Sequence, residues 1–590
     1  MAEPRGDMSA TPATAAPATA TPAIAPGAAS EPAPARRAAS DAVPGLRAAL
    51  ALQIAAALLW LPQAALLAGA VAALASGGGL AEVTLPAAGI AGLGLVRALA
   101  EAGGGRIAFR AARAELSRRR AVAAVALARR SPLDIARPPS GLAASVLAEQ
   151  AEAVVPYLSR FLPARYRAVV VPLVILACVL PLSWAAALIL AVCAPLIPLF
   201  MALIGWRAKE ASEAQLVEIG GMNAFLLDRL RGLATIRSFG AVEATARRLR
   251  ADAENLRQRT MAVLRIAFLS SAVLELFSAV GVAMVAGYIG FHLLGMIGFG
   301  AWGARLGLGE GLFILLVAPA FFEPLRDLSA AWHDRAAGQA ALAALDRLGA
   351  DGLPVVGTDE PVPARSGSAP EVRLEGVRFV HAHRAGSGSS APLFDGFDLT
   401  VAPGEHVALF APSGAGKSTL LALVAGLAPP QAGQVFVGGE ALTGESAARL
   451  RAGMAYIGQQ PHIFAGTLKG NIGLGRAGID AETVRAALRV ARLEEVAALR
   501  GPAPIGEGGR GLSGGEALRL ALARLAATPD AGLILADEPT AHLDSDTAAE
   551  VADGLLELAR GRTLILATHD PLLAARMDRV IPLGNGEVAP

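Results

Sequence analysis

The chain has 590 residues, of which 54% are hydrophobic and only 17% are charged, and its mean hydropathy is +0.50. A soluble globular protein carries about 25% charged residues, so part of this chain is expected to lie in lipid. The net charge of +2 is too small to indicate a nucleic-acid partner. The two cysteines, Cys178 and Cys193, lie in apolar runs and form neither a disulfide framework nor a zinc-site spacing.

The N-terminal segment, residues 1–45, is rich in Ala, Pro, Thr and Ser and has no apolar periodicity. Such a segment cannot bury enough apolar surface to fold, so we expect a disordered cytoplasmic tail. The apolar run that follows, about residues 48–75, is too long for the ~7–15-residue core of a signal peptide. It is interpreted as a retained first membrane helix.

Six apolar runs approach the ~20 residues that a membrane helix needs. They lie near residues 48–75, 84–104, 162–182, 184–205, 265–295 and 308–325. The third and fourth almost touch at Pro181, which predicts a tight hairpin. Residues 46–345 are therefore predicted to form an all-α transmembrane domain of six helices.

Basic residues predict the orientation. The segment between spans two and three and the segment between spans four and five are rich in Arg, whereas the other connections nearly lack Lys and Arg. Arg-rich loops stay in the cytoplasm, so both termini are predicted to be cytoplasmic. Apolar residues recur at helical spacing through 106–130 and 206–262, so these two regions are expected to be helices extending from the membrane.

Residues 346–370 are interpreted as a linker because Gly, Pro, Asp and Ser dominate the stretch from about 351 onward. Residues 371–590 have the composition of a soluble α/β domain. Short apolar runs at 406–410, 533–536 and 563–567 alternate with helical patterns, which is typical of buried strands between helices.

The first of these strands leads into a phosphate-binding loop. A loop in this strand–loop–helix context cradles phosphates with its backbone N–H groups and a helix N-terminus. Lys417 is placed to reach the β- and γ-phosphates of a nucleotide, and Ser418 to ligate Mg²⁺. The usual pattern opens with Gly, so Ala411 requires a turn that tolerates a Cβ. The loop residues are Ala411, Pro412, Ser413, Gly414, Ala415, Gly416, Lys417, Ser418 and Thr419.

The second predicted strand, Leu533-Ile-Leu-Ala, ends in two acids, Asp537 and Glu538. Asp537 is predicted to hold Mg²⁺, and Glu538 to orient or deprotonate the attacking water. In this order within one domain, the loop and the acidic pair predict an α/β P-loop nucleoside triphosphatase.

Further segments resemble the ATP-binding-cassette (ABC) superfamily. Leu512-Ser513-Gly514-Gly515-Glu516 is similar to its signature sequence, with Glu516 where Gln is common. The resemblance implies that this surface closes on ATP held by a partner domain. Glu516 has a simpler interpretation as a cap of the following helix.

The same resemblance implies roles for four other residues. Gln459 matches the residue that senses Mg²⁺ and contacts the membrane domain, and Asp544 lies in a segment similar to the D-loop. His569 matches the switch histidine that faces the γ-phosphate. His381 stands at the position of the aromatic residue that stacks on adenine, while Phe379 beside it is expected to be core.

Residues 225–239 resemble the second coupling region of exporter-type ABC transporters. Three further segments resemble the CydDC exporter family, which pairs a CydD with a CydC subunit: residues 259–275 and 311–327, which are similar to spans five and six, and residues 538–544. The resemblance implies a bacterial inner-membrane heterodimer with a CydC-like half-transporter, exporting cysteine or glutathione to the periplasm in support of cytochrome bd assembly. ATP and Mg²⁺ are its implied cofactors, and haem has been associated with the family.

Polar residues within the spans are the internal clue to a substrate cavity. The candidates are Glu275, His292, Glu323 and Arg326. Glu275 is expected to be the most buried and is the predicted cavity residue, with a helix–helix polar contact as the alternative. Three other functions stay open: an exporter of lipid, peptide or drug, a non-transporting membrane ATPase, and a scaffold without ATPase activity.

Overall fold

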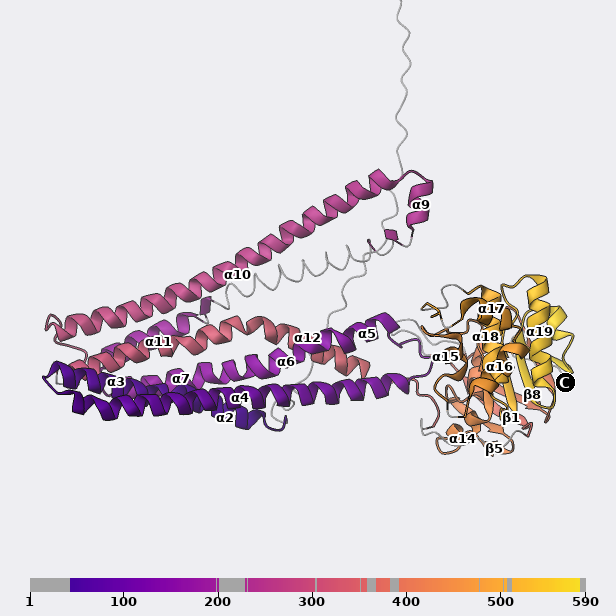
Figure 1. The fold of residues 1–590 in the computed structure, drawn as a ribbon, viewed down its shortest axis with the longest axis horizontal. Coiled ribbons are helices and arrows are strands. Elements are labelled where there is room, and N and C mark those ends of the chain that lie inside the picture. The colour runs from indigo at the N-terminus through magenta and orange to yellow at the C-terminus, as the bar shows by residue number, and fades with distance from the viewer. Residues whose placement is uncertain are drawn as a thin grey trace, which may run out of the picture. The chain divides into compact units, whose positions relative to one another are not determined.

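The computed structural model describes residues 43–197, 199–200, 226, 229–230, 232–302, 305–350, 352–357, 368–381, 392–476, 478–501, 503–506 and 512–583. By its contacts the chain forms two units, residues 1–113 with 158–331, and residues 114–157 with 332–590. The first unit is helical, and the second joins short helices to an α/β domain (Figure 1). The prediction of a disordered tail falls mostly on residues 1–42, outside the described residues.

The first unit is built from helices, most of them long and apolar. They are α2 (Leu46–Leu58), α3 (Trp60–Ala75), α4 (Leu80–Ala128, whose end enters the second unit), α7 (Leu162–Val179), α9 (Leu233–Ser238), α10 (Val242–Leu293) and α11 (Leu308–Ala330). Among the described residues, five helical segments are long and apolar enough to cross a membrane, and Trp184–Ile197 forms a shorter apolar helix. Five of the six predicted spans are thus confirmed; the fourth run extends into residues outside the described part.

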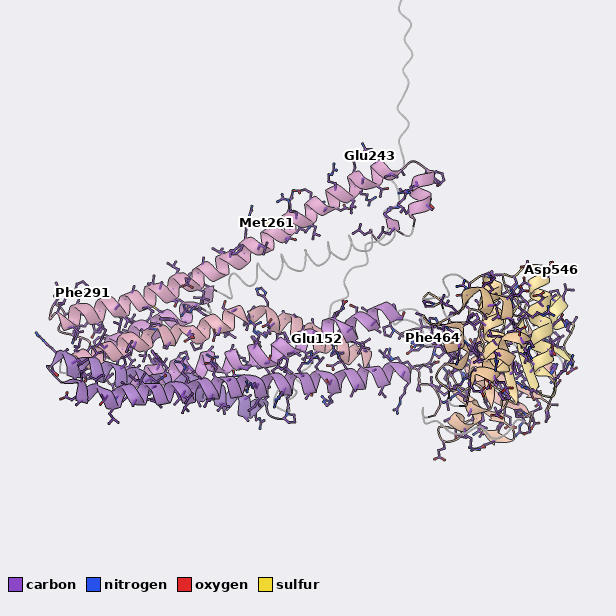
Figure 2. The ribbon with its side chains drawn as sticks, in the orientation of Figure 1. Glu152, Glu243, Met261, Phe291, Phe464 and Asp546 are labelled. Carbon is purple, nitrogen blue, oxygen red and sulfur yellow. The ribbon has the colours of Figure 1, made fainter. Side chains whose placement is uncertain are left out.

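Two helices are much longer than a membrane is thick. Helix α4 has 49 residues and α10 has 52, which correspond to roughly 75 Å each at about 1.5 Å per residue. Figure 2 shows α10 as one continuous helix from Glu243 past Met261 to Phe291. The helices predicted at 106–130 and 206–262 are therefore confirmed over 106–128 and 242–262.

The predicted hairpin at Pro181 is also present. Helix α7 ends at Val179 and the next helix begins at Trp184. The Ser183 hydroxyl accepts a hydrogen bond from the Ala186 N–H at 3.2 Å and donates to the Gly300 carbonyl at 2.8 Å. A serine at this position satisfies an otherwise unpaired N–H at the start of a helix, so the sequence favours a turn here.

Helix α11 lies at the centre of the first unit and contacts α3, α7 and α10. Its Phe321 and Phe322 are almost fully buried and meet edge to face, with ring centroids 5.0 Å apart. A Cβ at Gly281 of α10 would lie only 2.5 Å from Cζ of Phe322. Glycine at this position therefore permits the close approach of α10 and α11.

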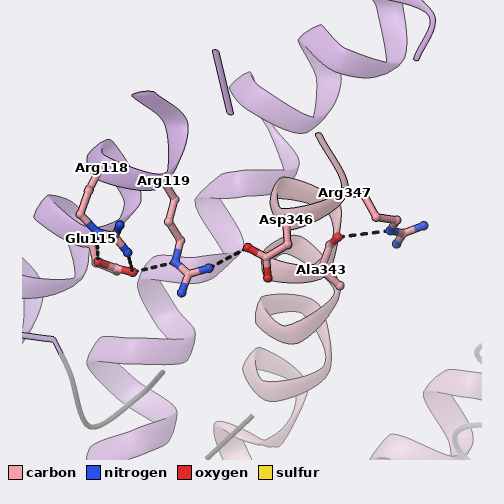
Figure 3. Close-up of polar contacts among 6 residues, drawn as sticks. All are labelled: Glu115, Arg118, Arg119, Ala343, Asp346 and Arg347. Atoms are coloured by element: carbon pink, nitrogen blue, oxygen red, sulfur yellow. Dashed lines mark hydrogen bonds and ion pairs between the residues drawn. The ribbon is translucent and has the colours of Figure 1, made fainter. Parts of the chain in front are cut away.

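The helical part of the second unit joins the end of α4 to α5 (Ser140–Ala148), η2 (Gln150–Ala153), α6 (Val154–Pro156) and α12 (Trp332–Leu348), and the π-helical turn η3 (Tyr157–Phe161) leads into the first unit. The guanidinium of Arg119 donates to Glu115 on its own helix and to Asp346 of α12 at 2.9 Å. Figure 3 shows this chain of contacts, in which Arg118 also bonds Glu115. The Arg119–Asp346 ion pair thus connects α4 with α12.

The segment after α12 is paired along its backbone. The N–H of Ser131 donates to the Leu353 carbonyl at 2.8 Å, and the N–H of Val355 donates to the Arg129 carbonyl at 2.8 Å. The next residue, Val356, donates to the carbonyl of Gly426 at 3.0 Å. Residues 352–357, predicted as part of a linker, therefore run between the end of α4 and the α/β domain.

The α/β domain contains two sheets. An antiparallel sheet has the order β2 (Phe394–Val401), β1 (Val372–Phe379), β4 (Ala432–Val437) and β5 (Glu440–Ala441). A parallel sheet has the order β6 (Met454–Ile457), β7 (Leu533–Asp537), β8 (Thr563–Thr568), β3 (His406–Phe410) and β9 (Arg579–Pro582). The three strands predicted from apolar runs are confirmed, β7 and β8 each being one residue longer.

Helices cover the parallel sheet. They are α13 (Lys417–Val424), α14 (Ala447–Ala452), α15 (Leu468–Gly473), α16 (Ala481–Val490), α17 (Glu494–Arg500), α18 (Gly514–Ala526), α19 (Ser545–Ala559) and α20 (Pro571–Ala574). Along β7, Leu533 and Leu535 belong to one buried cluster, whereas Ile534 and Ala536 belong to another. Both faces of the strand are buried, which explains its continuous apolar run.

Candidate nucleotide site

The phosphate-binding loop connects β3 to α13, which begins at Lys417. Gly414 and Gly416 have φ angles of +88° and +94°, a conformation that favours glycine. Ala411 is not among the residues with positive φ, and its side chain is 3% exposed in the core. The turn therefore tolerates the Cβ of Ala411, as the sequence requires.

The ammonium of Lys417 is buried and donates to three oxygens. It lies 2.6 Å from the Ala411 carbonyl, 3.2 Å from the Pro412 carbonyl and 3.1 Å from Oε1 of Glu538. A phosphate entering the loop competes with Glu538 for this ammonium. Lys417 is thus already directed at the loop interior and at the acidic pair.

The acidic pair stands at the end of β7. Glu538 has φ +48°, which is unusual for a residue with a side chain and is often found at functional sites. Its N–H donates to the Ala567 carbonyl of β8 at 2.8 Å, which holds the backbone in this conformation. The bend turns the chain at the carboxyl end of the sheet.

Asp537 is buried, and its environment fits a metal ligand. Burial raises the pKa of this carboxyl, and the charge of Glu538 adds to the rise, while a hydrogen bond from Ser418 and the charge of Lys417 oppose it. Its Oδ1 is buried without a hydrogen-bond partner among the described residues. A buried carboxylate oxygen beside a hydroxyl supplies the hard oxygen ligands that Mg²⁺ prefers.

His569 follows β8, and its Nδ1 is hydrogen-bonded to Oε2 of Glu538. Both carboxylate oxygens of Glu538 are therefore engaged, one by Lys417 and one by His569. Strands β7, β8 and β3 are neighbours in the parallel sheet, and their carboxyl ends bring these three residues together. In open α/β sheets ligands bind at this edge.

Two other predicted residues lie at the margin of this cluster. Gln459 follows β6, the neighbour of β7; it is exposed, and no hydrogen bond joins it to the cluster within the described chain. His381 lies beside the loop helix, with Nε2 3.3 Å from the Thr419 hydroxyl, and its ring meets that of Phe379 edge to face. Phe379 is fully buried, as expected of a core residue.

The signature residues Ser513, Gly514 and Gly515 form the start of α18. The Ser513 hydroxyl accepts from the Glu516 N–H at 3.2 Å, and the Glu516 carboxylate accepts from the Ser513 N–H at 2.7 Å. This reciprocal cap confirms the interpretation of Glu516 as a capping residue. No hydrogen bond joins these residues to the phosphate-binding loop in the part of the chain that the structure describes.

Asp544 caps the neighbouring helix α19 by accepting from the Thr547 N–H at 2.9 Å. Hydrogen bonds from the backbone and hydroxyl of Thr547 lower the pKa of this carboxyl. A Cβ at Gly515 would lie 2.7 Å from Cγ2 of Thr547. Glycine at position 515 therefore lets α18 and α19 pack closely. This packing holds the signature segment next to the segment that is similar to the D-loop.

The polar residues of the membrane helices differ from expectation. Glu275 is exposed on α10, whereas His292 is 2% exposed and its Nε2 accepts from the Leu306 N–H at 3.2 Å. The expectation that Glu275 is the most buried candidate is wrong for the single chain, and its role in a cavity stays a prediction. Sequence reasoning also missed Gln63, which is 6% exposed on α3. Its position as a polar residue within an apolar run was the signal that could have identified it.

Two family models match the chain. The model of the ABC transporter transmembrane region matches residues 47–303, and the ABC transporter model matches residues 394–541. The glutathione/L-cysteine transport system ATP-binding/permease protein CydD of Haemophilus influenzae is 37% identical over 78% of this chain and 77% of that protein. This chain belongs to the CydD family of ABC transporters. It is accordingly an ATP-hydrolysing membrane transporter of exporter type, as predicted.

Two further comparisons agree with the CydD family assignment. The CydC protein of Bacillus subtilis, of the same transport system name, is 32% identical over 73% of each chain. A bacterial Atm1-family ABC exporter with ATP bound has a similar fold, with a TM-score of 0.69 over 92% of this chain and 94% of that one. Its sequence identity is 24%, so this likeness supports the exporter fold alone.

Proposed function

We propose that this CydD family member is one half of a heterodimeric exporter that uses ATP hydrolysis to move cysteine or glutathione out of the cytoplasm. The observation that carries the proposal is its 37% identity to a CydD protein named for glutathione and cysteine transport. That relation spans both the membrane and the ATPase segments of the chain. Support of cytochrome bd assembly, and an association with haem, stay predictions from the family resemblance.

The proposed roles of the ATPase residues combine the geometry of the cluster with the family resemblance, and those of Gln459 and His381 rest on the resemblance alone. Lys417 and the backbone of the loop bind the phosphates, while Ser418 and Asp537 hold Mg²⁺. When bound, the metal ion neutralises charge that develops on the phosphates. Glu538 is the general base for the attacking water, and His569, bonded to its carboxylate, orients it. Gln459 then links this edge of the sheet to the membrane segments, and His381 contacts the adenine.

The proposal of a partner is supported by the separation of the signature residues from the phosphate-binding loop. Ser513, Gly514 and Gly515 cap their own helix and make no hydrogen bond to the phosphate-binding loop within the described chain. In this superfamily such residues close a site that another ATPase domain provides. A CydC-like half-transporter is the proposed partner, since CydC proteins share the transport system name.

The proposed location is the bacterial inner membrane, with both termini and the ATPase domain in the cytoplasm. The part of α4 beyond the apolar stretch carries six arginines, an arrangement that keeps a segment on the cytoplasmic side. They are Arg106, Arg110, Arg113, Arg118, Arg119 and Arg120.

The test uses inside-out vesicles that contain this chain with its CydC-like partner. ATP should drive accumulation of labelled cysteine or glutathione, and Lys417→Ala should reduce it. If neither thiol accumulates while a labelled lipid, peptide or drug does, the chain remains an exporter and the thiol assignment is wrong.

A further inference from the structure

An arginine lies inside the apolar part of α4. Arg97 lies 17 positions after Leu80, the first residue of the helix, which is about 26 Å at ~1.5 Å per residue. Arg106, the first residue of the basic stretch, follows nine positions later. A membrane core is about 30 Å thick, so Arg97 lies within it. Charged residues at this depth are costly and mark substrate or ion pathways.

The guanidinium of Arg97 is positioned by an aromatic ring. Its Cζ lies 5.6 Å from the centroid of the Trp60 ring on α3, within range of a cation–π contact. The Trp60 indole N–H donates to the Leu316 carbonyl of α11 at 3.2 Å, which fixes the ring. Arg97 is half-buried and, among the described residues, makes no hydrogen bond or ion pair. Its N–H donors therefore remain available.

A second polar side chain lies at the same α3–α4 contact. Gln63, one helical turn from Trp60 on α3, is 6% exposed and donates from Nε2 to the Ile90 carbonyl of α4 at 3.0 Å. Its Oε1 is buried and has no partner within the described chain. A buried acceptor without a partner is unfavourable, so a ligand that donates a hydrogen bond would relieve this cost.

Close packing makes the position of these groups rigid. A Cβ at Gly94 would lie 3.2 Å from Nε2 of Gln63, and one at Gly89 would lie 2.9 Å from Cδ1 of Leu66. On the other side of Arg97, a Cβ at Gly104 would lie 2.7 Å from Cγ of Gln53. Glycines of α4 thus allow this helix to approach α2 and α3 closely, both before and after Arg97 in the sequence.

We propose that Arg97 binds a carboxylate of the transported molecule and that Gln63 accepts a hydrogen bond from its ammonium or amide. A guanidinium binds carboxylates through two parallel N–H donors, and Oε1 of Gln63 is an acceptor only. A small amino-acid thiol carries both a carboxylate and an ammonium. This inference rests on the proposed thiol export. It assigns recognition of the carboxylate and of the ammonium or amide, but not of the thiol, to helices α3 and α4.

The experiment compares two labelled thiols in inside-out vesicles that contain the complex with the CydC-like partner. Cysteine has the carboxylate, and cysteamine is the same molecule without it. Arg97→Gln should raise the KM for cysteine by about 10- to 100-fold, the range expected for a lost charged hydrogen bond. The KM for cysteamine should be unchanged. Arg97→Lys should retain part of the preference for cysteine, and Gln63→Leu should weaken uptake of both amines.

Arg110→Gln is the matched control, because Arg110 is exposed on the same helix beyond the apolar stretch and should change neither KM. The inference is overturned if Arg97→Gln affects both thiols equally, the result expected of a residue that only positions helices or binds a lipid phosphate. It is also overturned if Arg97→Gln affects neither. If the unmodified complex accumulates no thiol at all, the proposed function itself fails, which is a different result from a loss of discrimination.

Discussion

Substituting Glu538 by Gln tests the catalytic assignment most directly. The carboxylate is 8% exposed, with Oε1 3.1 Å from Nζ of Lys417 and Oε2 bonded to His569. Glutamine has the same shape: its oxygen can still accept from Lys417 while its NH₂ donates to the imidazole. The fold of the site should therefore survive, and only the basicity and the charge are removed.

The expected loss has two parts. General-base assistance contributes about 10²–10⁴ in rate, so turnover at this site should fall by that factor. Hydrogen bonds to charged groups are worth about 1.5–3 kcal/mol, so weakening the contact with Lys417 should lower the free energy of unfolding by no more than that range. ATP binding should persist, because Lys417 and the loop backbone are intact and the phosphate no longer competes with a carboxylate.

The measurement is phosphate release by the proposed heterodimer, with the corresponding carboxylate of the proposed partner neutralised so that a single site turns over. Binding of a labelled ATP analogue is measured in parallel. Glu440→Gln is the matched control, since Glu440 pairs with Arg449 at the surface of the same domain and should leave turnover unchanged. Near-normal phosphate release by E538Q would show that the base is another group.

Three other predictions concern the metal ligand, the membrane core and the tail. Burial raises the pKa of Asp537 in the folded protein above its value in the unfolded chain. The contribution of Asp537 to the free energy of unfolding is therefore present at low pH, and it is lost as the pH rises from the usual aspartate range through the raised pKa. Asp537→Asn should flatten the decline of Tm with pH, measured by thermal unfolding without Mg²⁺, and should abolish Mg²⁺-dependent ATPase activity. A dependence of Tm on pH that stays the same would contradict the raised pKa of Asp537. Gly281→Ala should cost about 1–3 kcal/mol by overpacking against Phe322, 2.5 Å from the new Cβ, and Phe322→Leu should restore the Tm; no rescue would mean that the clash is elsewhere. Deleting residues 2–40 should leave membrane insertion and ATPase activity unchanged, whereas loss of insertion would identify the tail as a targeting element.

Sequence alone predicted which residues of the candidate ATPase site gather at one edge of the sheet, because such chemistry demands particular residue types in fixed places. Lys417 and Asp537 could be assigned from a strand, a glycine-rich loop and an acidic strand end, and the structure brings them to one edge of the sheet. The left-handed backbone of Glu538 and its bond to His569 could not be foreseen. They depend on β8 lying between β7 and β3, and strand order leaves no mark in local sequence.

The membrane segments were harder to predict, because an apolar helix gives no periodicity that separates a lipid face from a packed face. Glu275 was expected to be buried, yet it lies on an exposed face of α10. Gln63 was overlooked although it is 94% buried, the complement of its 6% exposure. In a helix that is apolar on all sides, only the neighbouring helices decide which polar residue is enclosed, and their arrangement is a property of the folded unit.

The connection between α12 and the ATPase domain shows the same limit in the backbone. Glycine and proline predicted a linker, but Leu353 and Val355 pair with the end of α4, and Val356 bonds the carbonyl of Gly426, just beyond helix α13. These are main-chain contacts, which almost any side chain permits, so composition could not reveal them. Because α13 begins at Lys417, a continuous hydrogen-bonded path of a few residues joins the phosphate-binding helix to α4. Any movement of α13 therefore has a backbone connection to the end of α4 that composition alone does not reveal.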